Sequence, residues 1–83
     1  MNVTSNTSLD ELFEIVKSTL AELNTGEEFI VKELFRGFEW NRIAKGTRTK
    51  LGSMVFNFAN HEGSTIIGPL GKTPQNQQKY KKL

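Results

Sequence analysis

The chain has 83 residues, enough for one domain with a modest core, and its lack of cysteine excludes a disulfide framework and thiolate zinc sites. Its net charge of +2 is unevenly distributed: residues 1–41 carry eight acids and three bases, whereas residues 42–83 carry eight bases and one acid. A chain divided in this way is expected to present one basic face. No apolar run reaches the roughly 20 residues of a membrane span, and residues 1–8 lack the segments of a signal peptide. We therefore expect a cytoplasmic protein without a membrane partner.

The first strong local signal is a helix start. Residues 1–7 are polar and expected to be flexible, so the domain is expected to occupy residues 8–83. Ser8-Leu9-Asp10-Glu11 has the spacing of a capping box, in which serine and glutamate satisfy each other's backbone amides. Apolar residues then recur at helical spacing, and Gly26 follows as a left-handed cap. These signals predict a helix over residues 9–23.

The next stretch predicts short elements. Residues 27–31 include adjacent β-prone side chains and predict a brief strand or an extended entry. Residues 32–36 predict a short helix that Gly37 ends. Phe38 and Trp40 are expected to pack beneath the following helix, and Trp40 is assigned a structural role on this basis.

The chain is organised around an amphipathic helix expected over residues 48–60, with Thr47 as its N-cap. Its apolar stripe consists of Leu51, Val55, Phe58 and Ala59. The opposite face carries polar side chains and one cation but no acid: Thr49, Lys50, Ser53, Asn57 and Asn60. A face without carboxylates predicts contact with a polyanion. Gly46 and Gly52 are assigned structural roles, Gly52 because a glycine costs a helix roughly 1 kcal/mol and is expected to allow close packing of a neighbouring backbone.

The C-terminal third predicts a β-hairpin. Residues 64–68 predict a strand, the prolines and glycines of residues 69–74 predict a turn, and residues 77–82 predict a return strand. The resulting order is helix, short strand, short helix, helix and hairpin. This order is that of an α+β winged helix-turn-helix with three helices, whose wing is the hairpin at residues 64–82.

Two segments resemble a small bacterial and phage family, a domain of unknown function with winged-helix character. They run from Phe29 to Phe56, including Glu39-Trp40-Asn41-Arg42 and Gly46-Thr47-Arg48, and from Leu70 to Lys82. The likeness covers about residues 28–82 of this sequence. It implies the fold, and it brings neither a catalytic residue nor a ligand.

The fold and the charge pattern together predict sequence-specific binding of double-stranded DNA, as in a transcriptional regulator of phage or mobile-element type. In a winged helix the recognition helix enters the major groove, while the wing contacts the backbone or the minor groove. Asn57 can read adenine and Lys50 can reach guanine, whereas Arg48 contacts a phosphate or pairs with Glu39. The residues expected to bind DNA are Lys45, Thr47, Arg48, Thr49, Lys50, Ser53, Asn57, Lys72, Lys79 and Lys81.

Other classes of function are less well supported by the sequence. An enzyme is not expected, because His61 is the sole histidine and sits where a helix cap is expected. We accordingly expect no metal, no cofactor and no small-molecule substrate. The alternative is a winged-helix interaction module that binds a protein partner such as a repressor, polymerase or nuclease. The amide-rich residues 75–78 suit that role, and the apolar stripe of the first helix would also suit a homodimer.

Overall fold

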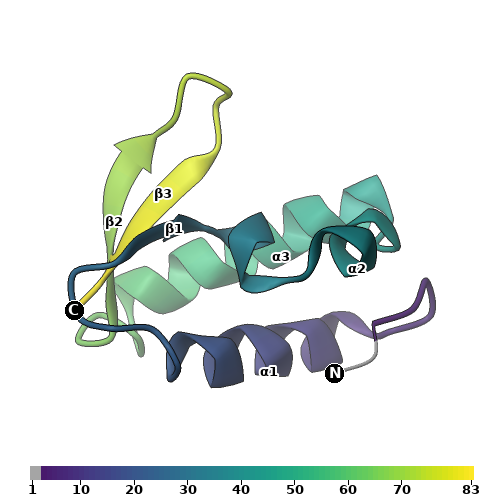
Figure 1. Cartoon of the computed structure of the whole chain (residues 1–83), viewed down its shortest axis with the longest axis horizontal. Coiled ribbons are helices and arrows are strands. Elements are labelled where there is room, and N and C mark those ends of the chain that lie inside the picture. The colour runs from purple at the N-terminus through teal and green to yellow at the C-terminus, as the bar shows by residue number, and fades with distance from the viewer. Residues whose placement is uncertain (1–2) are drawn as a thin grey trace.

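Three α-helices, one 3₁₀ helix (η1) and a three-stranded antiparallel sheet make up the computed structural model, which describes residues 3–83 (Figure 1). The elements in chain order are α1 (Leu9–Leu20), β1 (Glu28–Ile30), η1 (Val31–Leu34), α2 (Gly37–Asn41), α3 (Lys45–Asn60), β2 (Ile67–Lys72) and β3 (Gln78–Lys82). The predicted α+β class and the order of its main elements are confirmed. None of the helices in this part of the chain is long and apolar enough to cross a membrane.

Helix α1 starts as its sequence predicts and ends earlier. Ser8 Oγ accepts a hydrogen bond from the Glu11 amide at 3.2 Å, and the Glu11 carboxylate accepts from the Ser8 amide at 3.4 Å, which completes the capping box. The helix ends at Leu20, three residues before the predicted end. Gly26 does adopt a left-handed conformation, with φ of 95°, but in the turn before β1, where its amide donates to the Lys82 carbonyl at 2.8 Å.

The prediction for the middle of the chain is wrong in two places. The helix expected at residues 32–36 is the 3₁₀ turn η1, and Gly37 begins a helix instead of ending one. Helix α2 forms because Arg36 is extended and its carbonyl accepts the amides of both Glu39 and Trp40. Phe38 does not pack beneath α3 as expected. Phe38 is 53% exposed, and the guanidinium carbons of Arg36 and Arg42 lie 5.0 and 5.1 Å from the centroid of its ring.

Helix α3 begins three residues before the predicted start. Ala44 is its N-cap residue and accepts the Arg48 amide at 3.0 Å, so Thr47 lies in the first turn and is not the cap. Gly46 lies inside the same turn. The predicted end at residue 60 is confirmed. The apolar stripe is placed as expected, since Leu51, Val55 and Ala59 are buried and Phe58 is partly buried.

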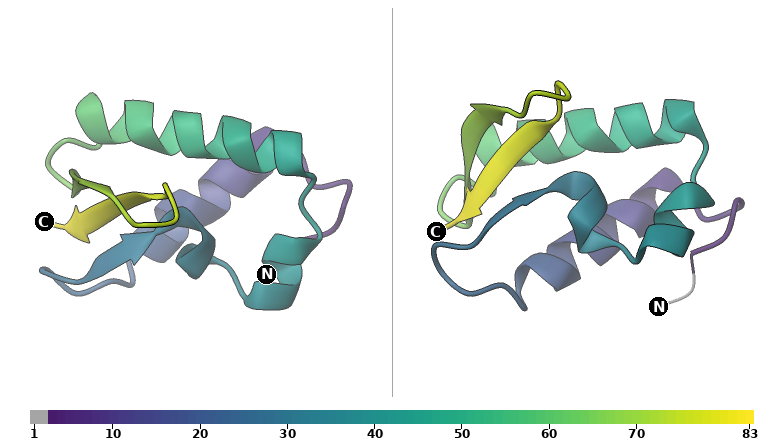
Figure 2. Two further views of the ribbon diagram at one scale, coloured as in Figure 1. Left: turned by 90° about the horizontal axis from the view of Figure 1, so that it is seen from above. Right: turned by 45° about the horizontal axis from the view of Figure 1, so that its top comes forward.

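The sheet has the order β1–β3–β2, with β3 in the centre (Figure 2). Strand β2 begins at Ile67, three residues after the predicted start, and continues through Pro69 and Gly71 to Lys72, so the hairpin turn lies later than predicted. An edge strand tolerates this proline, and the register shifts between Pro69 and Gly71. The chain instead turns at residues 73–77, where Asn76 has a positive φ of 62° and donates to the Thr73 carbonyl at 2.8 Å.

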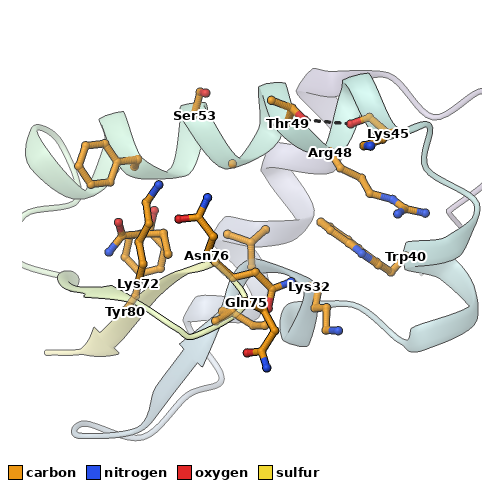
Figure 3. A pocket seen from close by; sticks show the side chains of 16 residues that line it. Lys32, Trp40, Lys45, Arg48, Thr49, Ser53, Lys72, Gln75, Asn76 and Tyr80 are labelled. Atoms are coloured by element: carbon orange, nitrogen blue, oxygen red, sulfur yellow. Dashed lines mark hydrogen bonds between the residues drawn. The ribbon is translucent and has the colours of Figure 1, made fainter.

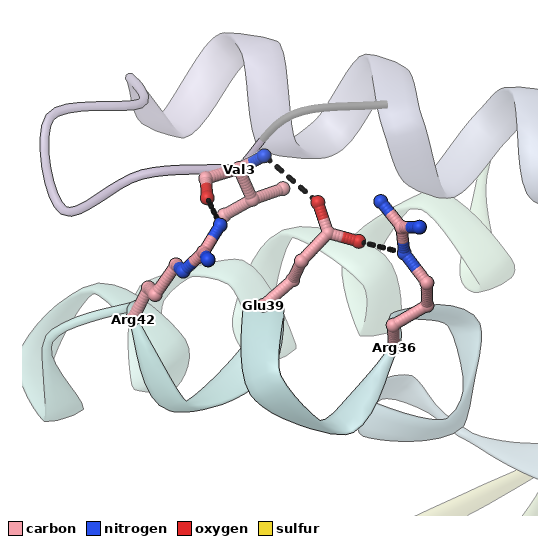
Figure 4. Close-up of polar contacts among 4 residues, drawn as sticks. All are labelled: Val3, Arg36, Glu39 and Arg42. Carbon is pink, nitrogen blue, oxygen red and sulfur yellow. Dashed lines mark hydrogen bonds and ion pairs between the residues drawn. The ribbon is translucent and has the colours of Figure 1, made fainter.

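A buried carboxylate joins α2 to the N-terminal segment (Figure 4). Glu39 is 3% exposed; it accepts the Val3 amide at 2.9 Å and forms an ion pair with Arg36. Arg42 Nη1 donates to the Val3 carbonyl at 2.8 Å. The hydrogen bond from Arg36, and after it the one from the Val3 amide, lower the pKa of Glu39 to about 2. The flexible segment expected at residues 1–7 thus includes a buried residue, Val3, whereas residues 1 and 2 lie outside the described residues.

Candidate nucleic-acid interface

A groove of about 1050 Å³ lies between α3 and the β2–β3 hairpin and extends to η1 and α2 (Figure 3). Residues of six elements, β1, η1, α2, α3, β2 and β3, meet in it because the hairpin rises beside α3 (Figure 1). Among the described residues that line it, the charged ones are all cations: Lys32, Lys45, Arg48 and Lys72. The hairpin tip adds four amide side chains, those of Gln75, Asn76, Gln77 and Gln78. The groove thus presents positive charge and hydrogen-bonding groups to whatever occupies it.

One side of α3 forms the helical wall of this groove. Its lining residues recur every three or four positions, which places them on one helical face: Lys45, Arg48, Thr49, Gly52, Ser53 and Phe56. Phe56 is unusual among them because it is a large apolar side chain that is 45% exposed. An exposed aromatic ring inside a basic groove offers a surface for stacking or apolar contact.

Trp40 and Arg48 form one end of the groove. The Arg48 guanidinium carbon lies 5.4 Å from the centroid of the Trp40 ring, in cation–π geometry, and the indole also contacts the Phe35 ring at 5.5 Å between centroids. Arg48 therefore does not make the alternative pair with Glu39, which binds Arg36. Arg48 Nε is buried without a hydrogen-bond partner among residues 3–83. Trp40, assigned a structural role from the sequence, lines the groove as well.

Gly52 does not have the packing role expected from the sequence. Apart from its two chain neighbours and the nearby backbone of α3 itself, a Cβ atom built at Gly52 would meet no atom of the described residues within 4 Å, so no backbone of another element approaches it. The glycine instead leaves open space in the wall of the groove. The same test at Gly46 also finds nothing within 4 Å in residues 3–83.

The structure separates the three hairpin lysines that the sequence grouped together. Lys72 lines the groove. Lys79 and Lys81 flank the buried Tyr80 in β3, so the alternation of a strand places both on the opposite face of the sheet. There Lys79 Nζ lies 2.8 Å from a carboxylate oxygen of Glu28, and this hydrogen bond raises the pKa of Lys79 and lowers that of Glu28. Lys79 and Lys81 are therefore not part of the groove.

The remaining predicted residues lie outside the groove on α3. Lys50 and Asn57 are exposed on the strip of α3 next to the groove wall, and Thr47 is half-buried. Asn57 also borders a small cleft of about 190 Å³ with Phe13, His61 and the acid Glu62. The His61 ring nitrogen Nδ1 lies 2.8 Å from the Asn57 carbonyl, in the helix-end position expected for it. The groove thus collects five of the predicted residues: Lys45, Arg48, Thr49, Ser53 and Lys72.

Sequence reasoning missed several lining residues, and Tyr80 is the most informative. Tyr80 is fully buried, stacks on Phe29 at 5.7 Å between centroids and points from β3 toward α3 (Figure 3). Its hydroxyl lacks a hydrogen-bond partner within the described part of the chain, and burial raises its pKa to about 12. Phe56 could have been noticed, because it interrupts the polar face of the helix. Lys32 and Tyr80 reach the groove only through the packing of the sheet.

The fold and the groove define a small α+β domain with an acid-free polar surface on one helix and one hairpin. A family model described as "Domain of unknown function (DUF1413)" matches residues 14–82. The chain belongs to this family, which confirms the resemblance to a small family of unknown function. No curated protein and no solved structure matches the chain.

Proposed function

We propose that this protein is a winged helix-turn-helix that binds duplex DNA. The order of its elements and the sheet order β1–β3–β2 support this fold. In this interpretation α2 and α3 form the helix-turn-helix, with the turn at residues 42–44, and the β2–β3 hairpin is the wing. The recognition helix α3 would lie in the major groove, with the wing against the backbone.

The observation that carries the proposal is that neither α3 nor the β2–β3 hairpin contains an acid and that no acid lines the groove between them among the described residues. The strip with Lys50, Ser53 and Asn57 adjoins the groove with Lys45, Arg48 and Lys72, and no acid lines that groove among the residues described. Phosphate contacts supply most of the affinity for DNA, and a carboxylate in such a surface would repel them. Because the net charge is only +2, a surface of this kind reflects local clustering of the bases.

Fluorescence anisotropy of a labelled duplex, titrated at several salt concentrations, tests the proposal. We expect affinity to fall steeply as salt rises, because bound lysines and arginines release counterions from DNA. Lys72→Ala should reduce the slope of log affinity against log salt by about one unit. Lys81→Ala is the matched control, because it removes the same charge from the opposite face of the same hairpin. Absent or salt-insensitive binding, or equal effects of the two variants, would contradict the proposal.

Base reading is assigned to the exposed strip of α3. Asn57→Ala or Lys50→Ala should lose about 1–3 kcal/mol of binding free energy on the preferred site and relax discrimination at one base pair. A pool of random duplexes selected on the wild-type protein identifies that site. If a variant with both Lys50→Ala and Asn57→Ala retains the sequence preference of the wild-type protein, α3 does not read bases.

A protein-interaction module is the second candidate, and one observation favours it. Phe56 is 45% exposed beside the amide-rich hairpin tip, and exposed aromatic rings are frequent at protein interfaces. This candidate replaces DNA binding if the duplex titration fails at low salt. In either case the protein is proposed to bind without catalysing a reaction, without a cofactor and without a metal.

A further inference from the structure

We propose that the groove between α3 and the hairpin is a binding site for one unstacked nucleotide of a DNA strand. Its base enters the space beside Gly52, and its phosphate meets the cations of the groove. The inference rests on the proposed function, because it specifies which part of the DNA occupies the groove. The exposed strip of α3 and the groove thus have different tasks, since one reads paired bases and the other holds an unpaired one.

The space in the groove is the first argument. Its volume of about 1050 Å³ is slightly above the range of about 300–1,000 Å³ for small-molecule pockets, and the groove is open to solvent on one side, so a nucleotide has room in it. Gly52 leaves the helical wall open, with nothing in the described chain within 4 Å of a Cβ built there. One helical turn further along, Phe56 presents a half-exposed ring. A glycine next to an exposed aromatic residue creates room for a planar group that stacks on the ring.

The chemistry of the walls is the second argument. Amide side chains can pair with the edges of bases, and Asn76 points from the hairpin tip toward α3 (Figure 3). Arg48 and Lys72 supply positive charge at separate positions along the groove. Aromatic stacking combined with cations along the backbone path is the usual means of holding a single strand. An acidic peptide would use the cations, but it would use neither the ring nor the amides as fully.

Two buried polar atoms are the third argument. The Tyr80 hydroxyl and Arg48 Nε both belong to residues that line the groove, and neither has a hydrogen-bond partner in residues 3–83. Buried polar atoms without partners are rare in folded proteins and call for an explanation. Both atoms are covered in this structure, so the polar atoms of a base or its phosphate would satisfy them only if the surrounding side chains move to admit the nucleotide. A fully paired duplex would meet the groove cations through its phosphates, but it would bring no base to these two atoms.

Trp40 makes the inference directly testable, because it is the only tryptophan and it lines the groove. The intact protein is titrated with a thymidine oligonucleotide, with a duplex and with thymidine monophosphate, and Trp40 fluorescence is recorded. We expect the single strand to quench the fluorescence, because its base and phosphate occupy the groove that the indole lines. Labelled-duplex anisotropy is measured in parallel, so a failure of DNA binding is distinguished from a failure of the nucleotide site.

Gly52→Leu is the deciding variant, because a side chain there enters open space and fills the groove. It should weaken the affinity for the single strand, measured by quenching, by roughly tenfold or more and weaken duplex affinity, measured by anisotropy, by a smaller factor. Gly46→Leu is the control, since Gly46 also faces open space in the described chain but does not line the groove. Phe56→Leu removes the stacking surface without filling the groove, and it should also lower the affinity for the single strand. Thermal melts establish that each variant is folded.

The contrary outcomes are specific. If the oligonucleotide does not quench Trp40, or quenches it equally in wild type and Gly52→Leu, the groove holds no nucleotide. If thymidine monophosphate binds as tightly as the strand, the ligand is a free nucleotide and the assignment to a DNA strand is wrong. If polyglutamate displaces the oligonucleotide and binds more tightly, the groove is a site for an acidic protein.

Discussion

The two sides of α3 use the same residue types in opposite ways. Toward α1, the Phe58 ring packs edge-on against Phe13 at 5.6 Å between centroids, and Gly63 fits so closely that a Cβ there would overlap the Phe58 ring. Toward the hairpin, Phe56 is 45% exposed and Gly52 faces open space in the described structure. Toward α1, the structure is closed around Phe58 and around Gly63 in the turn that follows α3, whereas the side of α3 toward the hairpin is open.

Helix α2 shows the same division between neighbouring residues. The Glu39 carboxylate is enclosed by the N-terminal segment and Arg36. Trp40, the next residue, lies in the groove under Arg48, whose Nε has no partner among the described residues. A domain of this size has a small core, so it needs close packing on the closed side. The open side contributes less to stability and is accessible to a ligand. Substitutions on the two sides should therefore change the free energy of unfolding by different amounts and in opposite directions.

The largest effect on stability is expected at Gly63. Gly63→Ala forces a methyl group against the Phe58 ring, and overpacking of this kind costs about 1–3 kcal/mol of the free energy of unfolding. Urea denaturation followed by Trp40 fluorescence measures the loss. Adding Phe58→Leu should restore part of it by shortening the side chain that clashes. A neutral Gly63→Ala variant would show that the closed side is not tightly packed.

Acid should lower the stability of the folded protein by protonating Glu39. The folded pKa of about 2 lies below the ordinary value of 4.5, so the stability that Glu39 contributes is present above pH 4.5 and is lost as the pH falls toward 2. Glu39→Gln should melt at a lower temperature than wild type at neutral pH, and the difference should close as the pH approaches 2. A difference that does not change with pH would mean that Glu39 is not ionised in the folded protein.

On the open side, Gly52→Ala should have a smaller effect of opposite sign. Alanine is favoured over glycine inside a helix by about 0.5–1 kcal/mol, and the added methyl group meets open space. We expect the urea midpoint to rise by a corresponding amount. Gly46→Ala in the first turn of α3 is the matched comparison. A loss of stability at Gly52 would mean that the groove closes on it in solution.

The smallest effect on stability at neutral pH is expected for Tyr80→Phe, at most about 1 kcal/mol, because the lost hydroxyl is buried without a partner in the described chain. Tyr80 is the sole tyrosine, so its ionisation is visible in the ultraviolet spectrum. The pKa should be about 12 in the folded protein and near 10 after unfolding in urea. The preference for the neutral phenol is present below pH 10 and is lost as the pH rises through 12. An ordinary pKa would show that water reaches the hydroxyl.

Several features of this protein were predictable from the sequence because they depend on residues close together in the chain. The capping box of α1 needs only four consecutive residues, and the buried stripe of α3 follows from helical spacing. The acid-free polar strip of α3 is predictable for the same reason. The α+β class follows from the order of these local patterns.

The groove itself was decided by contacts between distant residues. Strand pairing extended β2 through Pro69, moved the hairpin turn and divided Lys72 from Lys79 and Lys81. The Glu39 carboxylate takes its partner from Val3, 36 positions away, and no local pattern predicts that. Whether a glycine is packed or open, as at Gly63 and Gly52, depends on what tertiary packing brings next to it. Spacing along the chain therefore determined the helices and their faces, whereas only the packing of the hairpin against α3 decided which of the charged and aromatic side chains share one groove.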